Sequence, residues 1–237
     1  MLLTSSKAVN APTKSAQRGP KDQRVRQGYR LGSVLGVVSL LLSALLVSIV
    51  IEWLGIAFWW EDEGLSHSVS MVAVESGYLN KDFTEGLFDS SPMLAIMRFA
   101  SAAYYYVFEW TQLENGFRWL GETFGIYDYT MAIPAITHLF FIRLGVLFFS
   151  LPVYGLAAVA GITSGLTFRD IRRWSAGREF GRVYHFAKSF APRMLIVAWF
   201  IYLAVPVAIH PNLIILPFAV LFGINVTIMS ASYKKYL

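Results

Sequence analysis

Few side chains in this 237-residue sequence are of types that could do chemistry, and the best candidates are one acid and one imidazole. Glu179 and His185 could act as acid and base or as metal ligands, but two groups do not complete a site. The sequence has no cysteine, which excludes disulfides, thiolate metal sites and cysteine nucleophiles. It also lacks the lysine-containing phosphate loop, the HExxH helix and the Gly-x-Ser-x-Gly elbow. We therefore predict that the protein is not an enzyme and has no cofactor, and that Glu179 pairs with an arginine.

Two charged side chains lie at the ends of long apolar runs, where charge is costly. A charge at the centre of a bilayer costs on the order of 3 kcal/mol, and Glu52 and Arg143 both fall near the outer ends of predicted membrane helices. They could form an intramembrane ion pair, or each could reach the head-group layer by itself. A proton or substrate relay would need more buried ionisable groups than the later membrane helices provide.

A basic segment, residues 169–190, has the most specific pattern in the sequence. Apolar residues recur in it at spacings of three or four, which predicts two short amphipathic helices hinged near Gly177. Their apolar faces would lie on the membrane or on a neighbouring helix, and their basic faces would meet lipid phosphates or an acidic protein. The predicted partner-binding or lipid-binding residues are Arg169, Arg172, Arg173, Arg178, Glu179, Arg182, Tyr184, His185 and Lys188.

Membrane helices must position these residues, because the chain is 56% hydrophobic with a mean hydropathy of +0.52. Only 15% of its residues are charged, where soluble domains usually have about 25%. We predict an all-α polytopic membrane protein with four transmembrane helices, at 33–57, 131–168, 191–209 and 213–231. The second of these includes an extension beyond the membrane that precedes the uncharged run 144–168.

The distribution of charge orients the predicted helices. The disordered tail 1–32 has seven Lys/Arg against one acid, and residues 169–190 and 232–237 are also basic, whereas 58–130 has eleven Asp/Glu against three Lys/Arg. Because cytoplasmic loops collect Lys and Arg, both ends of the chain and the basic segment should face the cytoplasm. Residues 58–130 should then form a helical extracytoplasmic domain.

Within this domain we predict helices at 66–79 and near 91–123, with a turn at 80–82. The run 93–110 is apolar enough to resemble a fifth span, but a crossing there would place the basic segment outside and contradict the charge rule. The many aromatic residues favour a position on the membrane surface, packing within the domain, or a partner surface.

Small residues indicate where the membrane helices pack closely. The first span has Gly32 and Gly36, and the second has Gly161 and Gly165, each pair at a spacing of four. Such pairs let helix backbones approach, so we predict that these two spans pack on each other.

The basic segment also resembles a known family. The pattern Arg169-Asp170-x-Arg172-Arg173, Gly177-Arg178-Glu179 and Tyr184-His185-x-Ala187-Lys188, placed between the second and third spans, is similar to that of the integrating conjugative element membrane proteins, a family of unknown function from bacterial conjugation gene clusters. The resemblance implies the inner membrane of a Gram-negative cell. It also implies association with a type IV secretion apparatus near its coupling-protein ATPase, and it supplies no catalytic residues.

Together these observations predict a non-catalytic docking or assembly subunit whose partners are membrane lipids and subunits of the secretion apparatus. We expect no direct sequence-specific binding of nucleic acid. One alternative is a small transporter or channel, which should need Glu52 or Arg143. Another is an independent surface-exclusion or lipid-organising membrane protein.

Overall fold

The computed structural model describes residues 34–82, 92–174 and 181–233. Within these residues the chain is all-α, as predicted, with seven α-helices and one π-helical turn. The elements are α2 (Val34–Phe58), α3 (Leu65–Asp82), α4 (Pro92–Tyr104), η1 (Tyr105–Glu109), α5 (Leu113–Phe124), α6 (Tyr127–Trp174), α7 (Gly181–Ala204) and α8 (Pro211–Ala231). Four of the described helices, α2, α6, α7 and α8, are long and apolar enough to cross a membrane, which confirms that part of the prediction.

The chain divides into two compact units between Ser39 and Leu40, inside α2. In the first unit the described residues form the opening turns of α2, where the Ser39 hydroxyl donates to the Gly36 carbonyl at 2.9 Å. Gly32, the other glycine of the first predicted pair, lies outside the described residues. The second unit holds the rest of α2 and all the other described helices.

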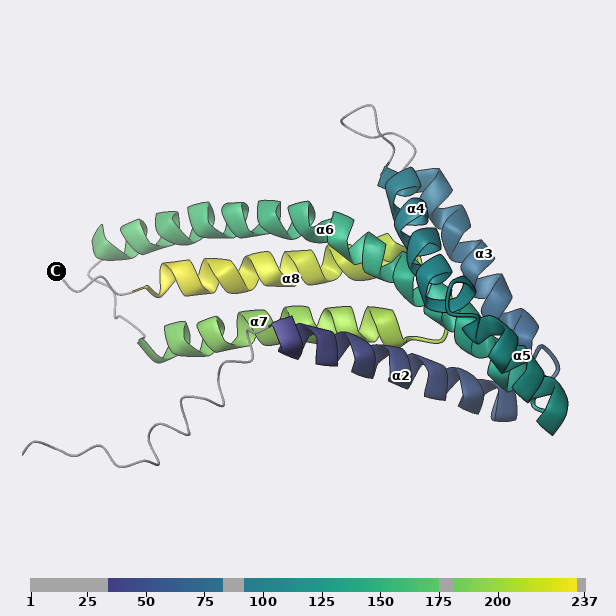
Figure 1. The fold of residues 1–237 in the computed structure, drawn as a ribbon. Helices are drawn as coiled ribbons and strands as arrows, with labels where there is room; N and C mark the ends of the chain where they lie inside the picture. Colours follow the sequence, from purple (N-terminus) through teal and green to yellow (C-terminus); the bar gives the residue numbers. More distant parts are fainter. Residues whose placement is uncertain (1–33, 83–91, 175–180, 234–237) are drawn as a thin grey trace, which may run out of the picture. The chain divides into compact units, whose positions relative to one another are not determined.

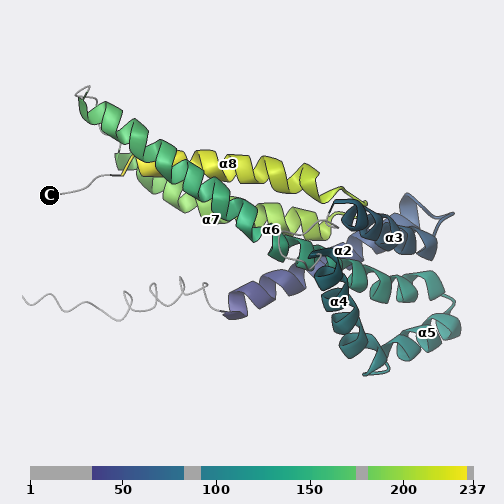
Figure 2. The ribbon, with the colours of Figure 1, turned by 90° about the horizontal axis from the view of Figure 1, so that it is seen from above.

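Three long helices of the second unit run side by side, with α8 beside both α6 and α7 (Figure 1 and Figure 2). Glycines permit the close contact of α6 with α8: a Cβ atom on Gly161 would lie 2.5 Å from the Gly223 oxygen, and one on Gly165 would lie 2.6 Å from the Thr227 oxygen. Between α8 and α7, the Asn225 side chain donates to the Ala187 carbonyl at 3.2 Å. Gly161 and Gly165 therefore pack on α8, whereas the sequence pattern pairs them with the first span.

The longest helix, α6, connects two groups of helices. Its 48 residues extend for about 72 Å, more than twice the roughly 30 Å hydrocarbon core of a bilayer. Its C-terminal part lies along α8, and α3, α4 and α5 pack on its N-terminal half (Figure 1). At Gly145 a Cβ atom would lie 3.0 Å from Cγ2 of Ile96, so α4 crosses α6 closely at this point.

Several helix boundaries differ from the sequence pattern. The single helix predicted near 91–123 is interrupted before α5, where Gln112 has a left-handed φ of 60°. Helix α3 continues to Asp82, through the predicted turn. Helix α7 ends at Ala204, before the predicted 209, because a residue that precedes proline disfavours helical geometry and Val205 precedes Pro206. Helix α8 then begins at Pro211, where a missing N–H costs nothing.

Candidate functional site

The described residues of the basic segment gather with the chain that follows α8. The Arg169 guanidinium lies 5.9 Å from the centre of the Tyr233 ring, and the Lys188 ammonium lies 6.0 Å from the centre of the Tyr184 ring. The two tyrosine rings meet edge to face, with centres 5.6 Å apart. The Arg172 guanidinium donates to the Ala231 carbonyl. We call Arg169, Arg172, Tyr184, Lys188 and Tyr233 the basic-aromatic cluster.

Helix geometry and electrostatics explain why the cluster forms. Helices α6 and α8 both end near it, and carbonyl groups at a helix C-terminus lack partners and carry partial negative charge. The guanidinium of Arg172 supplies a donor and a positive charge to the end of α8. The faces of the tyrosine rings attract Arg169 and Lys188 by cation–π interaction. The cluster thus holds two cations on aromatic rings at the ends of three helices.

The remaining predicted binding residues surround this cluster in the sequence. His185 is exposed, and its ring meets that of Tyr184 at 5.5 Å. Arg173 belongs to α6 and Arg182 to α7. Arg178 and Glu179 lie outside the described residues, as does the predicted hinge near Gly177, so the pairing of Glu179 with an arginine stays a prediction. In place of two separate short helices, the described parts of the segment are the end of α6 and the beginning of α7.

A second constellation is buried where α3, α6 and the α7–α8 connection meet. Arg143 is 1% exposed and Glu75 is 2% exposed. Arg143 Nη2 donates to Glu75 Oε1 at 2.5 Å, and Nε donates to both carboxylate oxygens at 3.0 and 3.1 Å. Burial raises the pKa of the Glu75 carboxyl, and the hydrogen bonds and charge of Arg143 oppose that rise, followed by the backbone N–H of Ile209. Each member of the pair therefore neutralises the charge of the other in a place that water does not reach.

The same guanidinium also binds the end of α7. Its Nη1 donates to the carbonyls of Tyr202 at 3.2 Å and Val205 at 2.6 Å, and its Nη2 donates to the Val207 carbonyl at 2.9 Å. The guanidinium carbon also lies 5.6 Å from the centre of the Tyr202 ring. All five N–H groups of Arg143 therefore have acceptors. This arrangement fixes α3, α6 and the connection to α8 relative to one another, and it leaves no donor for a transported ligand.

Glu52 has different partners from those the sequence pattern predicts. Its side chain is 0% exposed, and its Oε1 accepts from the Ser68 hydroxyl at 2.5 Å and contacts His67 Nδ1 at 3.0 Å. The Trp60 ring stacks on His67 with centres 4.0 Å apart. In place of the predicted Glu52–Arg143 ion pair, Glu52 thus binds α3, and Arg143 binds Glu75. Neither alternative from the sequence is found: the two residues do not pair, and neither reaches the surface, because α3 supplies a buried partner for each.

Sequence reasoning missed Glu75 and Tyr233, although the sequence holds a signal for the first. Ser68, Met71, Glu75 and Leu79 recur at spacings of three or four and are all buried, so Glu75 lies in the stripe that α3 turns inward. A carboxylate in such a stripe needs a buried cation, and Arg143 is the obvious candidate in a nearby apolar run. Tyr233 gives no comparable signal, because its contacts arise only from the packing of α6, α7 and α8.

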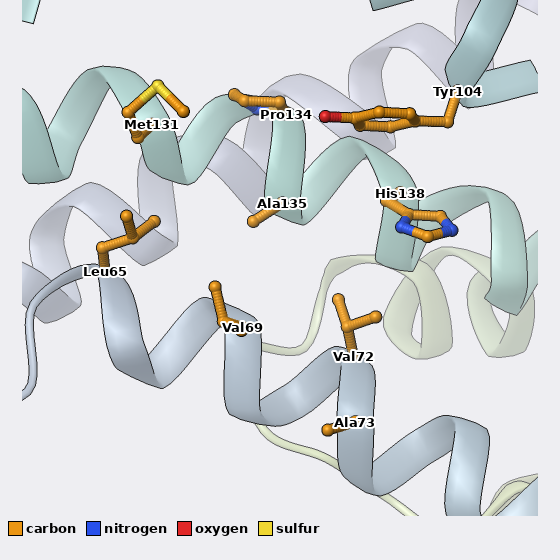
Figure 3. A pocket seen from close by; sticks show the side chains of 9 residues that line it. All are labelled: Leu65, Val69, Val72, Ala73, Tyr104, Met131, Pro134, Ala135 and His138. Carbon is orange, nitrogen blue, oxygen red and sulfur yellow. The ribbon is translucent and has the colours of Figure 1, made fainter. Parts of the chain in front are cut away.

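A groove of mainly apolar character lies between α3, the end of α4 and α6 (Figure 3). Its polar members are His138 and Tyr104, whose rings lie 5.1 Å apart. The Tyr104 hydroxyl donates to Glu114 Oε2 at 2.9 Å. Burial, followed by this hydrogen bond, raises the pKa of Tyr104 to about 12. The other lining residues are Leu65, Val69, Val72, Ala73, Met131, Pro134 and Ala135.

Comparison with known proteins places these features in a family. Residues 59–234 match the family model described as IncC plasmid conjugative DNA transfer protein DtrJ-like. The matched range contains the buried pair Arg143 and Glu75 and the whole basic-aromatic cluster. A search of curated proteins and a search of solved structures each gave no match. The family match confirms the resemblance to conjugation-associated proteins that the basic segment indicates.

Proposed function

Because the chain belongs to the DtrJ-like family of IncC plasmid conjugative DNA transfer proteins, we propose that it is a non-catalytic inner-membrane subunit of a conjugative, type IV secretion apparatus. In this proposal its membrane helices anchor it, and its basic segment docks cytoplasmic partners such as the coupling-protein ATPase. The observation that carries the docking role is the position of the basic segment, whose described residues gather at one end of α6, α7 and α8.

The proposed orientation follows from charge. The basic-aromatic cluster lies at one end of the α7–α8 pair, and the buried pair Arg143–Glu75 lies at the other, against the connection between those helices. The acidic residues 58–130, which include α3, α4 and α5, belong to that second end. The positive-inside rule then favours a cytoplasmic cluster, with both chain ends in the cytoplasm and an extracytoplasmic helical domain.

The buried pair supports a docking role over a transporter or channel role. A transport residue must exchange its partners during the cycle, whereas every N–H of Arg143 is engaged by Glu75 or by a carbonyl of the α7 end. Arg143 therefore fits a residue that holds helices together.

Co-purification tests the docking role. The tagged full-length protein is extracted in a gentle detergent from conjugating cells, and the associated proteins are identified by mass spectrometry. We expect secretion subunits to co-purify, and we expect the double variant Arg173→Glu, Arg178→Glu to lose a cytoplasmic partner while it still inserts. Arg172 is left unchanged because it binds the end of α8.

The matched control reverses an exposed charge far from the cluster, Arg98→Glu on α4. This variant should retain the partner. Normal co-purification from the double variant, or the absence of any stable complex in the unmodified protein, would count against docking. The second result would favour an independent lipid-organising protein.

A further inference from the structure

Two cations of the basic-aromatic cluster, Arg169 and Lys188, are held in place by aromatic rings. Arg169 and Lys188 each lie over a tyrosine ring, and in the described part of the chain neither makes an ion pair or a hydrogen bond. A ring quadrupole attracts a cation but does not use up its N–H donors. Both residues can therefore donate to an anion that approaches from outside.

The two tyrosines add neutral donors between the cations. Their rings touch at 5.6 Å, and neither the Tyr184 nor the Tyr233 hydroxyl donates a hydrogen bond within the described residues. Phosphate oxygens accept hydrogen bonds from guanidinium, ammonium and phenol groups alike. Asp170, on the same turn of α6 as Arg169, is exposed and is the acid nearest to these cations in the sequence. The order Arg169, Tyr233, Tyr184, Lys188 thus forms a row of donors that crosses from α6 to α7.

Exposed apolar residues lie at the same level of the helices. Phe168 is next to Arg169 on α6, and Phe186 and Phe190 flank Lys188 on α7, with their rings stacked at 5.9 Å. All three belong to helices long and apolar enough to cross a membrane. Cations and tyrosines at the level where exposed apolar side chains end are typical of a membrane surface, where a phosphate lies directly above acyl chains.

From this geometry we infer that Arg169, Tyr233, Tyr184 and Lys188 bind the phosphate groups of an anionic membrane phospholipid. The inference rests on the proposed function only for the placement of this end at the inner leaflet. It divides the basic segment into two parts. The cations over the tyrosine rings hold lipid, whereas the proposed docking is tested at other residues of the segment, Arg173 and Arg178.

Lipid titration of the purified, delipidated full-length protein in a neutral detergent tests this inference. The probes are phosphatidylglycerol and phosphatidylcholine with the same acyl chains, and binding is read by native mass spectrometry. We expect the unmodified protein to prefer phosphatidylglycerol. The double variant Arg169→Gln, Lys188→Gln should bind it roughly 25-fold more weakly, since each of the two basic residues at an anionic surface contributes about a fivefold factor.

Two further variants control for folding and for general charge. The double variant Tyr184→Phe, Tyr233→Phe keeps both rings and both cations and should lose at least about fivefold in affinity, the effect of two hydroxyl donors. The variant Arg98→Gln removes an exposed cation on α4 and should leave the affinity unchanged. If the charge variant fails to fold, the tyrosine variant decides the question.

Three results would overturn the inference. These are equal binding of the two lipids, unchanged phosphatidylglycerol affinity in the cluster variants, or an equal loss in the Arg98→Gln variant. Inorganic phosphate is added as a competitor, and its displacement of the lipid at equal concentration would assign the site to a free anion. The protein is measured alone, so the absence of a secretion partner cannot produce a failure here, and a failure here leaves the docking test intact.

Discussion

At the scale of single residues, the buried Arg143 determines how the two groups of helices meet. A buried charge is tolerated only when it is paired and hydrogen-bonded, and Arg143 satisfies this condition through Glu75 and three carbonyls. The carbonyls belong to the end of α7 and the chain beyond it, which lack helical partners of their own. The Arg143 side chain therefore neutralises the Glu75 carboxylate of α3 and also supplies hydrogen-bond donors to the carbonyl groups at the end of α7.

We predict strong coupling between these two residues. Removal of one partner, in Glu75→Leu or Arg143→Leu, should lower the free energy of unfolding by about 3 to 5 kcal/mol, because an uncompensated charge or several unpaired carbonyls stay buried. The double variant Glu75→Leu, Arg143→Leu should lose much less than the sum of the two, since both charges are gone. Equilibrium unfolding in detergent measures the three values.

The exposed pair Arg118 and Glu114 provides the matched control. Their side chains meet at 3.4 Å but are 51% and 29% exposed. Loss of this pair in Arg118→Leu should therefore cost less than about 1 kcal/mol. Equal and additive losses at both pairs would contradict the role that we assign to Arg143.

A second residue-scale prediction concerns the titration of Tyr104. Its pKa in the folded protein is raised to about 12 from an ordinary 10.0, so folding favours the protonated phenol. The contribution to stability is therefore fully present below pH 10 and is lost as the pH rises through about 12. The ultraviolet difference spectrum between the unmodified protein and Tyr104→Phe follows this titration.

The variant Glu114→Gln separates the causes of this shift. It removes the carboxylate that accepts the Tyr104 hydrogen bond at 2.9 Å, while the burial of Tyr104 remains. The pKa of Tyr104 should then fall part of the way towards its ordinary value. A titration identical to that of the unmodified protein would leave burial as the sole cause.

The sequence shows which charged residues lie at costly positions, but it does not show which residues pair with them. The costly placement of Glu52 and Arg143 in apolar runs is visible in the sequence, and both are indeed buried. Their partners are Ser68, His67 and Glu75, all on α3, and these depend on how a helix outside the predicted spans packs back on them. Periodicity gives the buried face of α3, but not which helix that face meets.

At the scale of elements, glycines set the distance between α6 and α8. We predict that Gly161→Ala and Gly165→Ala each lower the free energy of unfolding by about 1 to 3 kcal/mol, because the added methyl groups would overlap backbone oxygens of α8. On the same helix, a Cβ atom added to Gly155 would meet nothing within 4 Å, so Gly155→Ala should be neutral or slightly stabilising. Thermal unfolding of the three variants in detergent provides the measurement, and equal effects at all three positions would refute close packing.

The long apolar runs, separated by charged segments, predict the existence of the four long helices, because a membrane-spanning helix is recognised by its length and hydropathy. Their packing is not predictable in the same way. The pattern of small residues correctly marks Gly161 and Gly165 as contact positions but assigns them the wrong neighbour. A small residue allows a neighbouring helix to approach closely, and both Gly223 on α8 and the glycines of the first span meet this condition. The interruption at Gln112 also escapes prediction, since glutamine is an ordinary helix former and gives no signal of a left-handed backbone.

At the scale of the whole molecule, orientation is the central claim. The proposed docking by the basic segment requires this end to face the cytoplasm, with the acidic residues 58–130 on the opposite side, and the same orientation would place the lipid site at the inner leaflet. The charge distribution predicts this arrangement, and the length of α6 allows it, since its 48 residues extend well beyond one hydrocarbon core.

Single-cysteine labelling tests the orientation most directly, because the natural sequence has no cysteine and every introduced thiol is unique. Trp119→Cys on α5 and Trp174→Cys at the end of α6 replace two exposed side chains. With a membrane-impermeant maleimide we expect Trp119→Cys to react when the inner membrane is intact, and Trp174→Cys to react only after that membrane is permeabilised. Labelling of Trp174→Cys across an intact inner membrane, with Trp119→Cys protected, would contradict the account.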